Sequence, residues 1–137
     1  MADAKPIQGV LETALYVDDL DAAVRFYRDV LGLTLIAKDA RRDAFFRCGP
    51  GVLLLFRAEQ TLQSDGEIPP HGASGPGHAA FSVPQAELGA WEARLREHGV
   101  QIERDHEWFG GMRSLYFRDP AGNCLELTSP GLWEIKD

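Results

Sequence analysis

Three side chains that can bind a metal ion, Glu12, His78 and Glu126, stand at related places in the sequence. Glu12 and His78 each lie near the start of an alternating stretch, at 11–17 and 77–83, and the two stretches share one pattern. Side chains alternate between the two faces of a strand, so each of these two lies opposite the larger apolar residues. A helix is expected after each strand, covering the apolar face. Both ligand-type side chains should therefore point away from the helices.

The third side chain, Glu126, belongs to a strand expected at 124–128, whose two leucines share the apolar face. Glu126 should then lie on the same helix-free face as Glu12 and His78. Each of the three alone would be an ordinary solvated or hydrogen-bonded side chain. Together, one imidazole and two carboxylates suit a divalent ion, and two uncompensated carboxylates would be costly without a cation. The pattern favours a metal site.

The elements that would position these residues occur twice in the same order. Module 1 (9–57) and module 2 (77–129) are each predicted as a strand, a helix and three antiparallel strands, separated by a Pro- and Gly-rich linker (58–76) and followed by a C-terminal cap (130–137). The expected strands are 9–17, 33–38, 44–47, 52–56, 77–83, 100–106, 113–118 and 124–128. The expected helices end at Gly32 and Gly99. Residues 1–137 are thus interpreted as one domain of class α+β, made of two tandem βαβββ modules.

The same alternation predicts which residues line a trough if the strands curl. Matching Gly51 with Gly122 places Leu55 opposite Glu126, so that leucine replaces the carboxylate in module 1. The residues expected to face the trough and contact a substrate are Phe45, Arg47, Leu53, Leu55, Ser114, Tyr116 and Arg118.

Three further residues are candidates at the mouth of the trough. His71 in the linker and Trp108 would close it, and Arg113 would meet an anionic group of the substrate. The alternatives are an exposed loop position for His71 and simple packing for Trp108.

Composition limits the partners. The chain has 137 residues, a net charge of −7 and a hydrophobic content of 45%, as in globular proteins. It has no basic run to neutralise phosphates, no apolar stretch near the ~20 residues of a membrane span, and no apolar leader at its start. We therefore expect a cytoplasmic protein with a small-molecule substrate and no nucleic-acid or membrane partner. Cys48 and Cys124 are expected to be buried or half-buried thiols.

The chain resembles the vicinal-oxygen-chelate superfamily, which includes glyoxalase I, bleomycin-resistance proteins, fosfomycin-resistance enzymes and extradiol dioxygenases. The resemblance covers nearly the whole chain. The segments that support it are VDDL (17–20), FY (26–27), VLGL (30–33), GH (77–78), FSV (81–83), YFRDPAGN (116–123) and LEL (125–127).

This resemblance implies a curved, U-shaped mixed sheet with helices on its outer face, a metal inside it, and often a homodimer. By position in the motifs, Glu12, His78 and Glu126 match the metal-ligand sites of the family. Glu12 stands where many members have histidine, and Leu55 stands at a fourth ligand position used by glyoxalase I. The chain therefore resembles the superfamily without matching one named member.

The implied chemistry begins with a substrate bound to the metal through two adjacent oxygens. Glu126 or Glu12 would serve as ligand and as the catalytic base. A glyoxalase I-like lyase or isomerase is favoured, with an extradiol-type dioxygenase or a metal-free antibiotic-binding protein as alternatives. The donors are compatible with Mn, Fe, Zn, Ni or Mg. The site is compatible with assembly within one chain or across a dimer.

Overall fold

The computed structural model describes residues 3–63 and 67–136, whose strands form two four-stranded sheets. The first sheet has the order β1 (Glu12–Tyr16), β4 (Gly51–Phe56), β3 (Asp43–Cys48), β2 (Thr34–Asp39). The second has the equivalent order β5 (His78–Ser82), β8 (Cys124–Thr128), β7 (Arg113–Arg118), β6 (Arg104–Glu107). In both sheets the first strand pairs in parallel with the last, and the other neighbours are antiparallel. The α+β class and the repeated βαβββ order are confirmed.

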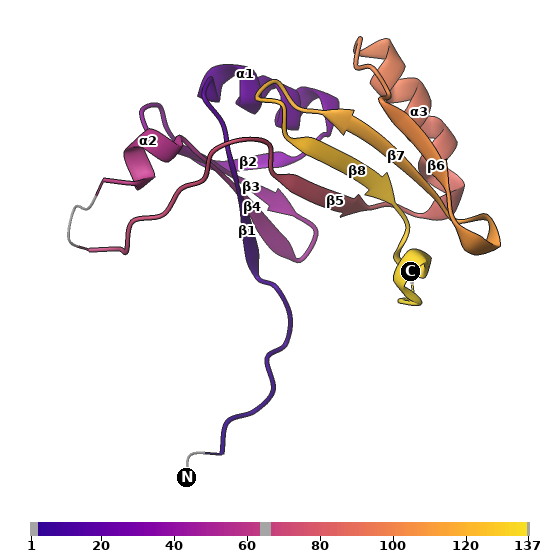
Figure 1. Ribbon diagram of the computed structural model, residues 1–137, viewed down its shortest axis with the longest axis horizontal. Coiled ribbons are helices and arrows are strands. Elements are labelled where there is room, and N and C mark those ends of the chain that lie inside the picture. The colour runs from indigo at the N-terminus through magenta and orange to yellow at the C-terminus, as the bar shows by residue number, and fades with distance from the viewer. Residues whose placement is uncertain (1–2, 64–66, 137) are drawn as a thin grey trace.

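Helices cover one side of the two sheets. α1 (Leu20–Arg25) is capped by the Asp19 carboxylate and continues as a π-helical turn over Phe26–Val30, and α3 (Leu88–Glu97) holds the equivalent place in module 2. Figure 1 shows both helices on the same side, with the N-terminal segment and the C-terminal cap leaving on the other. No helix in the described ranges is long and apolar enough to cross a membrane.

The covered face of each sheet forms the core. The alternating apolar side chains pack with those of α1 and α3 in one cluster that spans both modules. Its fully or almost fully buried strand residues are Leu15, Ala44, Phe46, Leu53, Leu55, Leu115, Phe117, Leu125 and Leu127. Full burial of each such leucine or phenylalanine stabilises the fold by about 1.5–3 kcal/mol.

A buried hydrogen-bond network joins the modules around the turn between β7 and β8. Tyr27 of module 1 donates its hydroxyl proton to Asp119 Oδ2 over 2.7 Å, and Asn123 Nδ2 donates to the carbonyl of Tyr16 over 3.0 Å. Asn123 Oδ1 accepts from the backbone amide of Gly77 at 2.7 Å. A Cβ on Gly77 would lie 3.3 Å from this oxygen, so glycine permits the close approach.

Some element boundaries differ from the sequence prediction. β1 begins at Glu12 rather than at residue 9, and β6 covers Arg104–Glu107 instead of 100–106. The half-buried Val100 and Ile102 pack against the core from a loop, so their apolar character reflected packing and not strand pairing. The short helix α2 (Ala58–Thr61) interrupts the predicted linker.

The structure also corrects the predicted match between β4 and β8. The first residue of β1 lies opposite Val52, and the first residue of β5 lies opposite Cys124. Two positions further along β4 and β8, Leu54 therefore corresponds to Glu126. The prediction that Leu55 holds this place is wrong.

An extra residue in the second turn explains the error. Arg47 pairs with Val52, five positions later, whereas Arg118 pairs with Cys124, six positions later. Matching glycine to glycine ignores this residue, and a slip of one residue moves every side chain of a strand to the other face. Leu55 is fully buried under the helices, as is its predicted trough neighbour at position 53, so neither lines the trough.

Candidate functional site

A histidine and a glutamate face each other on the helix-free side of module 2. His78 begins β5 and Glu126 lies in the middle of β8, and His78 Nε2 is 3.4 Å from Glu126 Oε1. The imidazole is about half exposed, whereas the carboxylate is buried. Two of the three predicted metal ligands therefore meet within one chain.

Hydrogen bonds orient both members of this pair. His78 Nδ1 lies 2.8 Å from the carbonyl oxygen of Cys124, which can only accept, so Nδ1 donates to it and Nε2 is the ring nitrogen that faces Glu126. Ser114 donates its hydroxyl proton to Glu126 Oε2 at 2.5 Å, which leaves Oε1 turned toward the imidazole. Nε2 of the imidazole and Oε1 of the carboxylate are thus turned toward each other. A metal-binding histidine held by a carbonyl at its other nitrogen has this arrangement.

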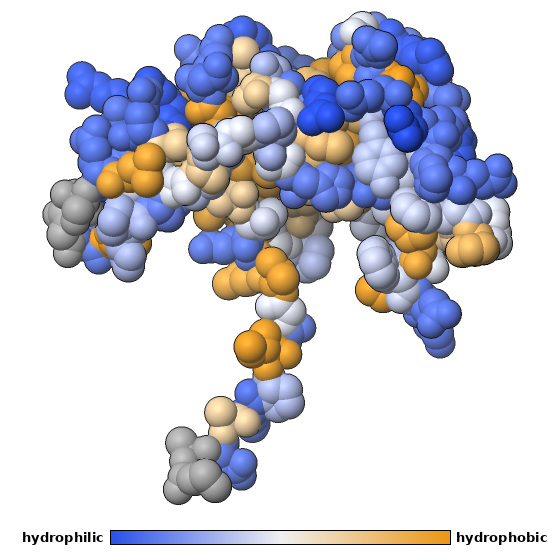
Figure 2. Space-filling model, in the orientation of Figure 1, coloured by the Kyte–Doolittle hydropathy of each residue, from blue (hydrophilic) through white to orange (hydrophobic). Residues whose placement is uncertain are grey.

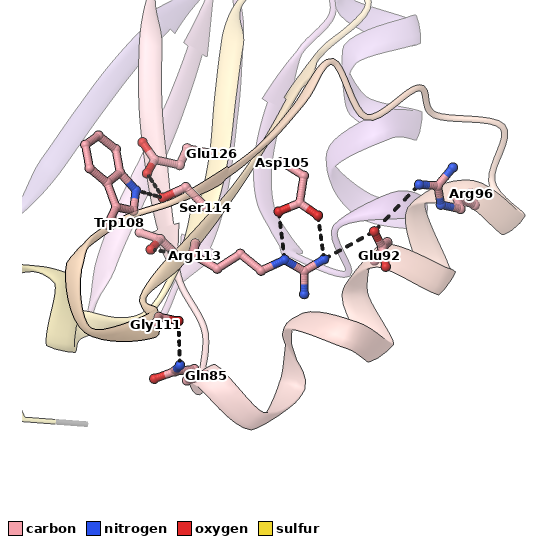
Figure 3. Close-up of polar contacts among 10 residues, drawn as sticks. Gln85, Glu92, Arg96, Asp105, Trp108, Gly111, Arg113, Ser114 and Glu126 are labelled. Atoms are coloured by element: carbon pink, nitrogen blue, oxygen red, sulfur yellow. Dashed lines mark hydrogen bonds and ion pairs between the residues drawn. The ribbon is translucent and has the colours of Figure 1, made fainter.

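The hydrogen bonds of Glu126 extend to a tryptophan. Trp108 Nε1 donates to Ser114 Oγ at 2.9 Å, and the Ser114 hydroxyl in turn donates to Glu126 (Figure 3). The indole N–H can only donate, so the direction of this chain is fixed. Alternation placed Ser114 on the trough face, but nothing in the sequence indicated its contact with Trp108.

Tyr116 forms the wall beside the pair. Its ring stacks on the imidazole of His78, with centroids 6.4 Å apart and planes inclined by 25°. Burial, and then the charge of Glu126, raises the pKa of the Tyr116 phenol. The structure thus places Tyr116 next to the predicted metal ligands in its protonated form.

Arg113 lies on the other face of β7. It donates from Nε and Nη2 to Asp105 at 2.7 and 2.9 Å, and from Nη2 to Glu92 of α3 at 3.2 Å. This pairing lowers the pKa of the Asp105 carboxyl. Figure 3 shows the Arg113 side chain directed toward α3, away from Glu126. The prediction that Arg113 meets an anionic substrate group is wrong, because odd-numbered residues of β7 face the helix.

Glu12 is exposed at the start of β1. Among residues 3–63 and 67–136, no three or more His, Cys, Asp or Glu side chains gather closely enough to hold a metal ion. A single chain therefore brings His78 and Glu126 together without Glu12.

The remaining candidates of module 1 lie on its helix-free face. Phe45 makes an edge-on contact with Phe56, with ring centroids 5.7 Å apart. The ring of His71, from the linker, packs on the ring of Phe56 with centroids 4.8 Å apart. His71 Nδ1 shares a hydrogen bond of 2.6 Å with the Tyr16 hydroxyl. Arg47 is exposed on β3. These contacts lie within module 1 and the linker that follows it.

Comparisons with known proteins agree with this architecture. A family model described as the Glyoxalase/Bleomycin resistance protein/Dioxygenase superfamily matches residues 9–127. The chain is 31% identical over 129 residues to metallothiol transferase FosB of Bacillus licheniformis, covering 93% of this chain and 79% of that protein. It is 32% identical over 114 residues to catechol-2,3-dioxygenase of Bacillus subtilis, covering 82% of this chain but 38% of that protein.

A solved structure of similar length also matches. The crystal structure of lactoylglutathione lyase from Agrobacterium tumefaciens superimposes with a TM-score of 0.92 and 43% sequence identity, covering 96% of this chain and 100% of that chain.

Proposed function

Because the chain belongs to the glyoxalase/bleomycin resistance protein/dioxygenase superfamily, we propose that it is a divalent-metal-dependent enzyme in which His78 and Glu126 bind the ion. The observation that supports this is the approach of His78 Nε2 to within 3.4 Å of Glu126 Oε1, which turns two metal-ligand atoms toward one place. Nitrogen and carboxylate donors suit Mn, Fe, Ni and Zn, and carboxylates suit Mg. The residues present therefore fit a divalent ion.

The third ligand is Glu12 of a second copy in a homodimer. Glu12 stands apart from the His78 and Glu126 pair of its own chain, on an exposed strand end. The residues just before it, Val10 and Leu11, are large, apolar and 85% and 74% exposed. A second copy would cover this apolar segment and bring Glu12 to the partner's pair.

The reaction we propose is of the glyoxalase I type, on a small substrate with two adjacent oxygens. The metal would supply charge stabilisation to those oxygens. Glu126 is restrained by Ser114 and serves as ligand, whereas the exposed Glu12 is freer to move a proton. The similarity to a lyase structure at 43% identity over 96% of the chain supports this reaction type.

Metal content and subunit mixing test the site together. His78→Ala and Glu12→Ala should each abolish stoichiometric metal binding and turnover. If the site is shared between chains, co-refolding the two inactive variants at equal amounts regenerates about one quarter of the wild-type sites, because each mixed dimer has one intact site. Refolding each variant alone is the control. No recovery would contradict the shared site, and full metal binding by His78→Ala would contradict the ligand assignment.

Thiol transfer is the second candidate function, favoured by the 31% identity to a metallothiol transferase over 93% of this chain. Metal-loaded protein given a 2-oxoaldehyde and glutathione should form a 2-hydroxyacyl thioester if it is a glyoxalase. Loss of free thiol to an electrophile, without thioester, would indicate a transferase. Oxygen uptake on catechol would instead indicate a dioxygenase, and ligand binding that needs no metal would indicate a binding protein.

A further inference from the structure

A cavity of about 520 Å³ lies beside Glu126 on the helix-free face of module 2. Its walls come from β7 and β8, from the turn that holds Trp108, and from the C-terminal cap at Pro130–Trp133. Its size is within the range of about 300–1,000 Å³ that holds small organic molecules. The cavity is thus large enough for a part of the substrate that extends beyond the metal ligands.

The lining of this cavity is mostly aromatic and apolar. The contributing side chains of this kind are Trp108, Phe109, Met112, Tyr116, Leu132 and Trp133. The charged residues in the lining are two carboxylates, Glu126 and Glu134, and the described part of the chain contributes no lysine or arginine to it. The nearby cation Arg113 is held by Asp105 and Glu92 on the other face of β7. An anionic group would therefore meet only like charge among the side chains of this lining, apart from a metal bound at Glu126.

One wall of the cavity is rigid and the rim is open. Trp108 is fixed by its hydrogen bond to Ser114 and by an edge-on contact with His106, with ring centroids 4.3 Å apart. Phe109 and Trp133 on the rim are 96% and 75% exposed. Large exposed aromatic side chains beside a cavity are favourable surfaces for a ligand to cover.

We infer that this cavity binds an uncharged aromatic group of the substrate, attached next to the oxygens that reach the metal. The inference rests on the proposed metal site at Glu126, and it specifies the substrate as a neutral aryl compound. Trp108 and Trp133 both line the cavity and would contact the ring. The charge of the lining excludes a carboxylate or phosphate on the part of the substrate that enters the cavity.

Calorimetric titration of three probes tests the inference. 2-Naphthol is neutral and has one oxygen, 2-naphthoate is its anionic counterpart, and 2,3-dihydroxynaphthalene adds a second, adjacent oxygen. The metal-free protein should bind 2-naphthol, with affinity about tenfold lower in Trp133→Ala. Trp91→Phe, which changes a tryptophan on α3 outside the cavity, should leave affinity unchanged. Equal binding of 2-naphthol and 2-naphthoate would overturn the inference.

The three probes separate this inference from the metal site. If the cavity exists without a metal site, 2-naphthol binds and zinc adds nothing to 2,3-dihydroxynaphthalene. If the metal site exists without the cavity, zinc strengthens the diol but Trp133→Ala affects neither probe. Sedimentation analysis of Trp133→Ala then measures whether this variant still forms a dimer. A loss of dimer with unchanged probe affinity would show that a second copy covers the rim, and would overturn the inference.

Discussion

The helix-free faces of the two modules differ although their backbones have the same strand order. Module 2 presents His78, Glu126 and Ser114 as one polar group, in which Ser114 donates to Glu126 and His78 Nε2 lies 3.4 Å from the same carboxylate. In module 1, Leu54 stands at the position of Glu126. On the same face, the ring of Phe45 packs on the ring of Phe56. The repeat therefore preserved the strand positions but not the polar residues on them.

The residue pairs between the last two strands of each module show this difference directly. Tyr116 lies opposite Glu126 in module 2, and the matching pair in module 1 is Phe45 and Leu54. Two polar partners in one module are replaced by two apolar partners in the other. Of the three proposed metal ligands, module 2 therefore carries His78 and Glu126, and module 1 carries the exposed Glu12.

A buried carboxylate lies in the last turn of module 2. The turn of module 2 contains Asp119, whose carboxylate accepts from Tyr27, from Asn123 and from backbone amides. Asp119→Ala should lower the free energy of unfolding by about 4 kcal/mol, because several buried donors lose their acceptor. Urea denaturation measures this change.

An exposed aspartate in module 1 provides the control for that measurement. Asp39 caps the hairpin between β2 and β3 by accepting from the amide of Arg41, and is exposed. Asp39→Ala should cost less than about 0.5 kcal/mol. Equal effects of the two substitutions would show that the Asp119 network does not hold the modules together.

The second prediction concerns the proposed metal ligands of module 2. His78→Ala should weaken Zn²⁺ binding on the order of 100-fold or more, since a ligand contributes at least as much as the groups that orient it. Metal analysis after dialysis measures the loss. His98→Ala, at the end of α3, is the matched control and should retain the metal. If both variants retained Zn²⁺, His78 would not be a metal ligand and the proposed metal site would not distinguish module 2 from module 1.

Much of the fold could be predicted from periodicity. The apolar alternation in β1, β3, β4, β5, β7 and β8 gave the right strands, since each has one face in the core and the other outside it. The error at Leu55 arose because alternation does not fix register across turns of different length. One residue more in a turn exchanges the two faces of the next strand.

The candidate site was predictable only in part. His78 and Glu126 come together because they lie on the same face of neighbouring parallel strands, two positions apart in register. The contact between Trp108 and Ser114 depends on the conformation of a turn with two glycines at positive φ, Gly110 and Gly111. Loop conformation of this kind has no periodic signal in the sequence.

The third prediction tests whether the hydrogen bond from Ser114 orients the Glu126 carboxylate for metal binding. Ser114→Ala removes the proton that Glu126 Oε2 accepts, so Zn²⁺ affinity should fall about tenfold. Ser82→Ala, an exposed position on β5, is the control. Trp108→Phe, which removes the indole N–H but retains a ring, should have a smaller effect in the same direction. Unchanged affinity in Ser114→Ala would mean that the carboxylate is oriented by packing alone.

The smallest predicted effect compares a tyrosine in each module at alkaline pH. Burial, and then the charge of Asp119, raises the pKa of Tyr27 far above its usual range, whereas Tyr116 is less buried and is shifted in the same direction. Tyrosines of the unfolded chain lose their proton near pH 10, so above that pH the unfolded state binds fewer protons than the folded state.

The stabilisation from the raised pKa of Tyr27 is therefore complete below pH 10 and decreases as the pH rises, by at most about 1.4 kcal/mol per pH unit. Urea unfolding at pH 9 and pH 11 should show a smaller decrease in Tyr27→Phe than in the wild type. Tyr116→Phe should reduce the decrease less, because its phenol is only partly buried. The reverse order would mean that the phenol beside Glu126, and not the one between the modules, dominates the response of the fold to alkali.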